Sequence, residues 1–79
     1  MANRASEADV IDRIRRHILF AGYTYTEAAT AIGMSHTTIY RCLKGHRAFE
    51  LAEILALAQL CEVDPCVFFS ADKADALNG

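Results

Sequence analysis

The sequence has 79 residues, of which 53% are hydrophobic, and its formal net charge is −2. A chain of this length forms one domain with a small core, and its apolar content, with only four Gly and one Pro, excludes a disordered chain. It contains no apolar run of the roughly 18 residues that cross a membrane, and its charged N-terminus lacks a signal-peptide pattern. We therefore expect a cytoplasmic protein.

The three cysteines, Cys42, Cys61 and Cys66, do not form a metal or disulfide pattern. Their number is odd, and no Cys-x-x-Cys pair occurs. The three histidines lie at no recognised ligand spacing from a cysteine. Each cysteine has apolar neighbours, so we expect three small buried hydrophobic residues, no bound metal and no cofactor.

Charge is distributed unevenly along the chain. The first 49 residues carry seven Lys and Arg against four Asp and Glu, net +3, whereas the rest carries one against six, net −5. Residues 28–49 contain no acidic residue, while Arg41, Lys44 and Arg47 recur every third position. A local basic face favours nucleic-acid binding even in an acidic protein. The alternative is an ordinary solvated helix face.

The first expected helix covers residues 7–21. Ser6 and Asp9 fit a capping box, and Gly22 supplies a left-handed stop. The apolar residues of this segment recur at helical spacing. They are Val10, Ile11, Ile14, Ile18 and Ala21.

A second helix is expected over residues 25–32. Thr24 and Glu27 have the spacing of a capping box, with Thr24 as the N-cap residue. Gly33 ends this helix, and Ser35 is placed to cap the next one.

The third expected helix, residues 36–44, has two chemically different faces and stops at Gly45. Its inner face carries Ile39, Cys42 and Leu43. Its outer face bears hydrogen-bonding and basic groups without a carboxylate. These are His36, Thr37, Tyr40, Arg41 and Lys44.

Two further helices complete an all-α prediction. The fourth covers residues 50–61, and a short fifth covers residues 65–69, with Asp64 as its N-cap. No segment alternates as a strand does. We expect one domain over residues 1–70 and a polar C-terminal tail over residues 71–79.

Two short helices joined through a Gly-apolar-Ser turn form a helix-turn-helix. The order of motifs over residues 7–70 resembles the XRE/Cro-type, lambda-repressor-like family. The matching residues are Thr24, Ala29, Gly33-Met34-Ser35, Thr38-Ile39, Gly45-His46-Arg47, Leu57-Ala58-Gln59-Leu60-Cys61 and Glu62-Val63-Asp64-Pro65, the last standing where the family has Gly-Val-x-Pro.

The chain departs from this family pattern at several positions. Tyr25 stands where the family commonly has a Gln that contacts phosphate and braces the recognition helix. Ile18 and Leu43 replace a frequent Arg–Glu pair between the first and third helices, a change that a packed core tolerates. Phe49 replaces a frequent Pro.

The resemblance implies a five-helix domain that binds double-stranded DNA through the third helix, as small Cro-type phage repressors do. It assigns base contacts to His36, Thr37 and Arg41. Phosphate contacts fall on a larger set. They are Thr24, Tyr25, Thr38, Tyr40, Lys44, His46 and Arg47.

Family members often bind palindromic operators as dimers. Here Val67, Phe68, Phe69 and Leu77 are the candidate apolar interface, although the two Phe residues are equally suited to closing the core. The chain has no paired carboxylates, Cys–His constellation or phosphate-binding glycine loop, so we expect no enzyme and no small-molecule ligand. Two alternatives remain: an antitoxin-type or excision-type accessory protein that binds DNA and a protein partner, and a helical interaction module without DNA binding.

Overall fold

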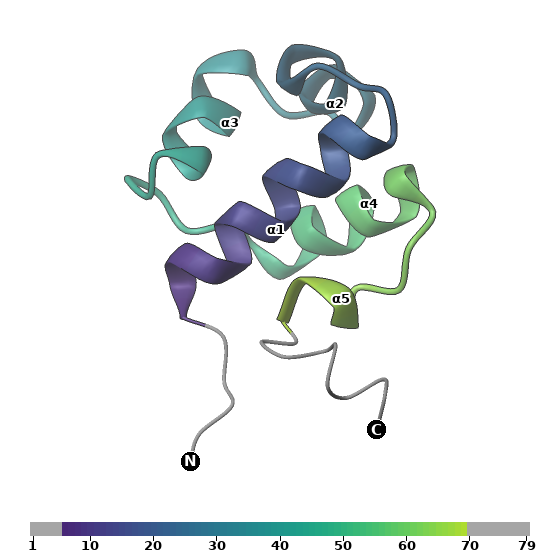
Figure 1. Cartoon of the computed structure of the whole chain (residues 1–79). Helices are drawn as coiled ribbons and strands as arrows, with labels where there is room; N and C mark the ends of the chain where they lie inside the picture. The colour runs from purple at the N-terminus through teal and green to yellow at the C-terminus, as the bar shows by residue number, and fades with distance from the viewer. Residues whose placement is uncertain (1–5, 70–79) are drawn as a thin grey trace, which may run out of the picture.

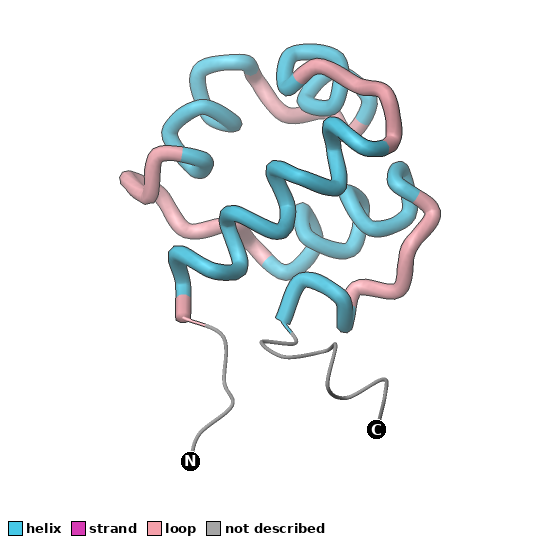
Figure 2. The backbone as a smooth tube through the Cα atoms, viewed as in Figure 1, coloured by secondary structure: helices cyan, strands magenta, loops and turns pink. Residues whose placement is uncertain are grey.

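The computed structural model describes residues 6–69, in which five α-helices are connected by short turns (Figures 1 and 2). The helices are α1 Glu7–Phe20, α2 Tyr25–Ala31, α3 His36–Leu43, α4 Leu51–Cys61 and α5 Cys66–Phe69. No strand occurs among these described residues. The all-α, five-helix prediction is confirmed, with each boundary within one residue. The predicted tail, residues 71–79, lies outside the described residues.

Local capping explains where the first two helices begin. The Ser6 side chain accepts from the Asp9 N–H at 3.1 Å, and the Thr24 side chain accepts from the Glu27 N–H at 3.0 Å. In both cases the acidic side chain accepts in return from the backbone N–H of the cap residue. Both predicted capping boxes are therefore present, and they satisfy N–H groups that a helix leaves without partners.

Helix α1 lies at the centre of the fold and contacts all four other helices. In Figure 1 it crosses the molecule diagonally, with α2 and α3 on one side and α5 on the other. Ile14 and Ile18 of α1 are fully buried together with Ile39 of α3, Leu57 of α4 and Phe68 of α5. Each helix thus contributes to one core, because each has an apolar stripe that must be removed from water. None of the helices in the described range is both long and apolar enough to span a bilayer.

The position of Phe68 corrects one sequence prediction. Its side chain is fully buried, and its ring meets the ring of His17 edge-on at a centroid distance of 5.6 Å. Phe68 therefore belongs to the core and is not available to a partner, whereas Val67 is half-buried and Phe69 is 46% exposed. Burial beside Phe68 and the nearby charge of Arg16 both lower the pKa of His17 below its ordinary value.

The three cysteines differ in burial, which the sequence did not predict. Cys42 is buried as expected, but Cys61 is only half-buried and Cys66 is exposed. Cys66 opens α5 at the surface, where its N–H donates to the Asp64 carboxylate at 2.9 Å. The prediction of three buried cysteines is therefore wrong for Cys66, because apolar sequence neighbours do not fix which face of a short helix is covered.

The chain leaves α4 through Glu62, which has a left-handed backbone conformation with φ 59° and ψ 45°. The next N–H, that of Val63, donates to the Ala58 carbonyl at 3.0 Å and closes the end of the helix. A residue with a Cβ is strained in this conformation, which explains why glycine is the usual residue at such a position.

We predict that Glu62→Gly raises the free energy of unfolding by about 0.5–1 kcal/mol, because relief of the left-handed strain exceeds the added entropy of the unfolded chain. Urea unfolding of the purified protein measures the change. Glu62→Gln is the matched control, since it removes the charge but keeps the Cβ, and it should leave the stability nearly unchanged. Equal stability of the two variants would contradict the explanation.

Candidate nucleic-acid interface

Helices α2 and α3 form a helix-turn-helix whose turn is closed by local hydrogen bonds. Gly33 has φ 79°, and the Met34 N–H donates to the Ala29 carbonyl at 2.8 Å. Ala28 and Ala29 are fully buried, and such small side chains let neighbouring helices approach closely. Met34 is almost completely buried in the turn. These contacts fix the angle at which α3 leaves α2.

The start of α3 is held by Ser35. Its side-chain oxygen accepts from the Thr38 N–H at 3.1 Å, while its hydroxyl donates to the Thr38 hydroxyl at 2.7 Å. Thr24 and Thr38 are two of the predicted phosphate contacts, and both form hydrogen bonds within the N-terminal caps of their own helices. Both lie near a helix N-terminus, where a phosphate contact remains a prediction.

The inner face of α3 is buried through Ile39, Cys42 and Leu43, as the sequence predicted. The outer face lines a shallow hollow of about 390 Å³. Its walls are formed by His36, Thr37, Tyr40, Arg41, Lys44 and His46. All three predicted base-contacting residues thus lie on one exposed surface with three of the predicted phosphate-contacting residues, and no carboxylate lines the hollow.

Two side chains on this surface are braced by α2. The rings of Tyr25 and Tyr40 meet edge-on at a centroid distance of 6.1 Å, an arrangement that aromatic rings favour. His36 Nε2 lies 3.2 Å from the Thr30 hydroxyl, with the direction of the hydrogen bond set by the histidine tautomer. Tyr25 therefore braces α3 through an aromatic contact at the position where the family commonly uses Gln.

Arg47 lies apart from the hollow and has acidic partners. Its guanidinium donates to both Glu53 carboxylate oxygens, at 3.0 and 3.1 Å, and to Glu50 at 3.3 Å. It also donates to the Cys42 sulfur at 3.1 Å, so it joins the end of α3 to the start of α4. Sequence reasoning assigned Arg47 to phosphate and missed Glu53, although an acidic residue in the first turn of the following helix was a visible signal.

These contacts shift the pKa values of Arg47 and Glu53. Hydrogen bonds to Glu53 and Cys42 raise the pKa of Arg47. Burial alone would raise the pKa of the Glu53 carboxyl, but hydrogen bonds from Arg47 and from the Glu50 N–H outweigh it, so this pKa lies below its ordinary value of 4.5. Glu53 is thus a stable anionic partner for Arg47 at neutral pH.

No metal site accompanies this surface. Within residues 6–69, no group of three or more His, Cys, Asp or Glu side chains is arranged to hold an ion. Cys42 faces the core and His36 faces the solvent, as the helical wheel predicted.

Because the pKa of Glu53 is depressed in the folded state, its contribution to stability is present above the unfolded pKa and is lost as the pH falls through the folded pKa. We predict that Glu53→Gln lowers the free energy of unfolding by about 1 kcal/mol at neutral pH. The difference from wild type should shrink below the ordinary carboxyl pKa of 4.5. Urea unfolding between about pH 3 and 7 tests this, and a pH-independent difference would contradict it.

The comparisons with known proteins agree with this geometry. The family model described as a helix-turn-helix domain matches residues 4–68. A solved structure, the restriction-modification controller protein C.AhdI from Aeromonas hydrophila, superimposes with a TM-score of 0.72 over 80% of this chain and 96% of that chain, at 22% sequence identity. That likeness shows that the two chains share a fold. A search of curated proteins finds no match. Because that model covers most of the chain, the protein belongs to the helix-turn-helix domain family.

Proposed function

We propose that this protein is a sequence-specific regulator of transcription that inserts α3 into the major groove of double-stranded DNA. The observation that carries the proposal is the outer face of α3, where exposed basic and hydrogen-bonding side chains line one hollow without a carboxylate. The major groove admits an α-helix and presents a distinct pattern of donors and acceptors for each base pair.

Base contacts are proposed for three residues of α3. Arg41 is exposed and lines the hollow, and its guanidinium fits the O6 and N7 atoms of guanine bidentately. The Thr37 methyl suits the thymine methyl group. His36 contacts a base edge through the ring nitrogen that does not face Thr30.

Phosphate contacts position the helix without selecting a sequence. Lys44 and His46 flank the hollow and are exposed, so they carry this role most directly. Tyr40 is also exposed, and Tyr25, Thr24 and Thr38 lie near helix N-termini. Arg47 contributes less to phosphate binding than its sequence position suggested, because its charge is already paired with Glu53.

We further propose that the protein acts in the cytoplasm as a homodimer on a palindromic operator, by binding rather than by catalysis. Among the described residues of the predicted interface, Val67 and Phe69 on α5 remain at least partly exposed, and Leu77 lies outside the described residues. The structural neighbour C.AhdI is a restriction-modification controller protein, which supports a role in regulation. We propose that this regulator is a small repressor of the Cro type.

Arg41→Ala should abolish the preference for one base pair in each half-site, a loss of about 1–3 kcal/mol of discrimination. Selection from a randomised duplex library, performed with wild type and variant, measures the preference at every position. Arg41→Lys is the matched variant: it keeps the charge, loses the bidentate geometry, and should give an intermediate preference. An unchanged preference in Arg41→Ala would show that another residue selects this base.

Lys44→Ala should weaken binding to all duplexes alike and reduce the salt dependence of log K by about one unit, since one phosphate contact is lost. Arg47→Ala should reduce it by less, because Arg47 is paired with Glu53. Fluorescence anisotropy at several salt concentrations measures both slopes. Arg16→Ala is a control, since Arg16 lies outside the hollow and pairs with Asp12. A wild-type protein that shows no salt-sensitive affinity for any duplex would instead favour a protein-interaction module without DNA binding.

A further inference from the structure

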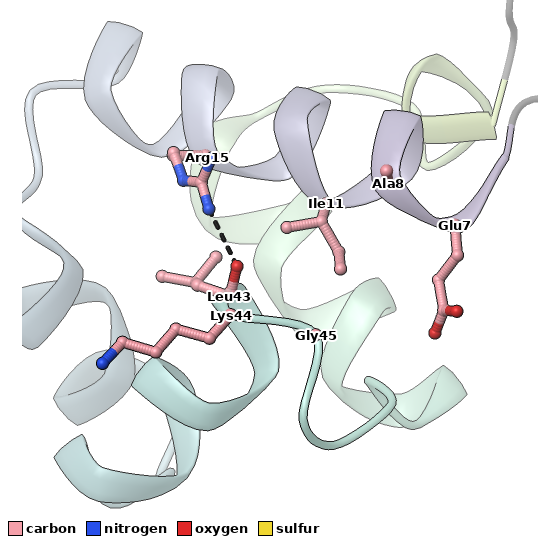
Figure 3. Close-up of a pocket in the computed structure, with 7 residues that line it drawn as sticks. All are labelled: Glu7, Ala8, Ile11, Arg15, Leu43, Lys44 and Gly45. Atoms are coloured by element: carbon pink, nitrogen blue, oxygen red, sulfur yellow. Dashed lines mark hydrogen bonds between the residues drawn. The ribbon is translucent and has the colours of Figure 1, made fainter.

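The C-terminal end of α3 is linked to α1 by one hydrogen bond between residues far apart in the sequence. Arg15 Nη2 donates to the Leu43 carbonyl oxygen at 2.8 Å (Figure 3). Leu43 is the last residue of α3, and its side chain is buried in the core. Arg15 is half-buried on α1.

This bond completes the hydrogen bonding of the end of α3. The last four carbonyls of a helix have no partner within the helix. Here the N–H groups of the next three residues satisfy the carbonyls of Tyr40, Arg41 and Cys42, at 2.9 to 3.0 Å. The Leu43 carbonyl remains, and the Arg15 guanidinium satisfies it. A cation at a helix C-terminus also interacts favourably with the helix dipole.

The surroundings of Arg15 do not resemble a phosphate site. The hollow beside it, of about 280 Å³, is lined by Glu7, Ala8, Ile11, Arg15, Leu43, Lys44 and Gly45. In Figure 3 the guanidinium points at the Leu43 carbonyl, and the Glu7 carboxylate stands at the other end of the hollow. Lys44 also lines the hollow, but the Arg15 guanidinium is already bonded to the Leu43 carbonyl, and the rest of the lining is the Glu7 carboxylate, apolar side chains and Gly45.

We propose that Arg15 is a positioning residue for DNA recognition, which acts through the Leu43 carbonyl by fixing the end of α3 against α1. This inference rests on the proposed function. Leu43 is two residues from Arg41, so a shift of this helix end displaces the proposed base-contacting guanidinium. Bidentate recognition depends on geometry, and small displacements therefore weaken it strongly.

Arg15→Ala tests the proposal, with Arg16→Ala as the matched control, because Arg16 is the adjacent arginine on α1 and is paired only with Asp12 in the described contacts. Affinity is measured for the duplex selected by the wild type and for a scrambled duplex, each at several salt concentrations. We expect Arg15→Ala to lose about 5-fold to 10-fold in affinity for the selected duplex. Scrambled-duplex affinity and the salt slope should stay at the wild-type values, and Arg16→Ala should bind like wild type.

Two further readouts separate positioning from a general structural role. In the Arg41→Ala background, Arg15→Ala should cause almost no further loss of affinity for the selected duplex, since both residues act on the same base contact. Amide hydrogen exchange at Lys44 and His46 should be faster in Arg15→Ala and unchanged in Arg16→Ala. Arg15→Lys keeps a cationic donor and should recover part of the affinity, which keeps the test valid if the alanine variant unfolds.

The outcomes are distinct. A salt slope reduced by about one unit, with equal losses on both duplexes, would make Arg15 a phosphate contact and overturn the proposal. Unchanged affinity for the selected duplex in Arg15→Ala would overturn it while leaving the proposed function intact. A wild-type protein that binds no duplex selectively would overturn both.

Discussion

The burial of one face of α3 decides which of its side chains are exposed to the solvent. Ile39, Cys42 and Leu43 are removed from water, and this fixes the rotation of the helix about its own axis. The opposite face must then be exposed, and it is the face that carries His36, Thr37 and Arg41. Burial is not directional enough to place a side chain for base recognition, so the helix also needs polar contacts at both ends.

The polar and aromatic contacts that hold α3 come from different parts of the chain. Ser35 caps the start of α3, and Tyr25 of α2 packs against Tyr40. At the other end Arg15 reaches the Leu43 carbonyl from α1, while Arg47 joins Cys42 to Glu53 of α4. The chain lacks the Arg–Glu side-chain pair that its family often places between the first and third helices, with Ile18 and Leu43 at those positions in the core. Instead, the guanidinium groups of Arg15 and Arg47 bind this end of α3, at the Leu43 carbonyl and the Cys42 sulfur.

Sequence reasoning predicted the parts of this arrangement that depend on local spacing. The capping boxes at Ser6 and Thr24 and the left-handed Gly33 are set by residues within a few positions of one another, so the sequence displays them directly. The two faces of α3 follow from helical periodicity in the same way. The contacts of Arg15 and Arg47 depend instead on how helices pack in three dimensions. Neither the depth of Phe68 nor the exposure of Cys66 was predictable, because a helix as short as α5 shows too few residues to define its buried face.

The proposed contact between Arg41 and guanine in the major groove can be probed with duplexes that contain 7-deazaguanine. This base lacks the N7 acceptor of the major groove but keeps its Watson–Crick pairing, its minor groove and the backbone charge. In a duplex selected by the wild type, substitution at the guanine assigned to Arg41 should weaken wild-type binding by about 3-fold to 10-fold and leave Arg41→Ala unaffected. Equal affinity of the wild type for both duplexes, or an equal loss in both proteins, would show that Arg41 does not contact this guanine.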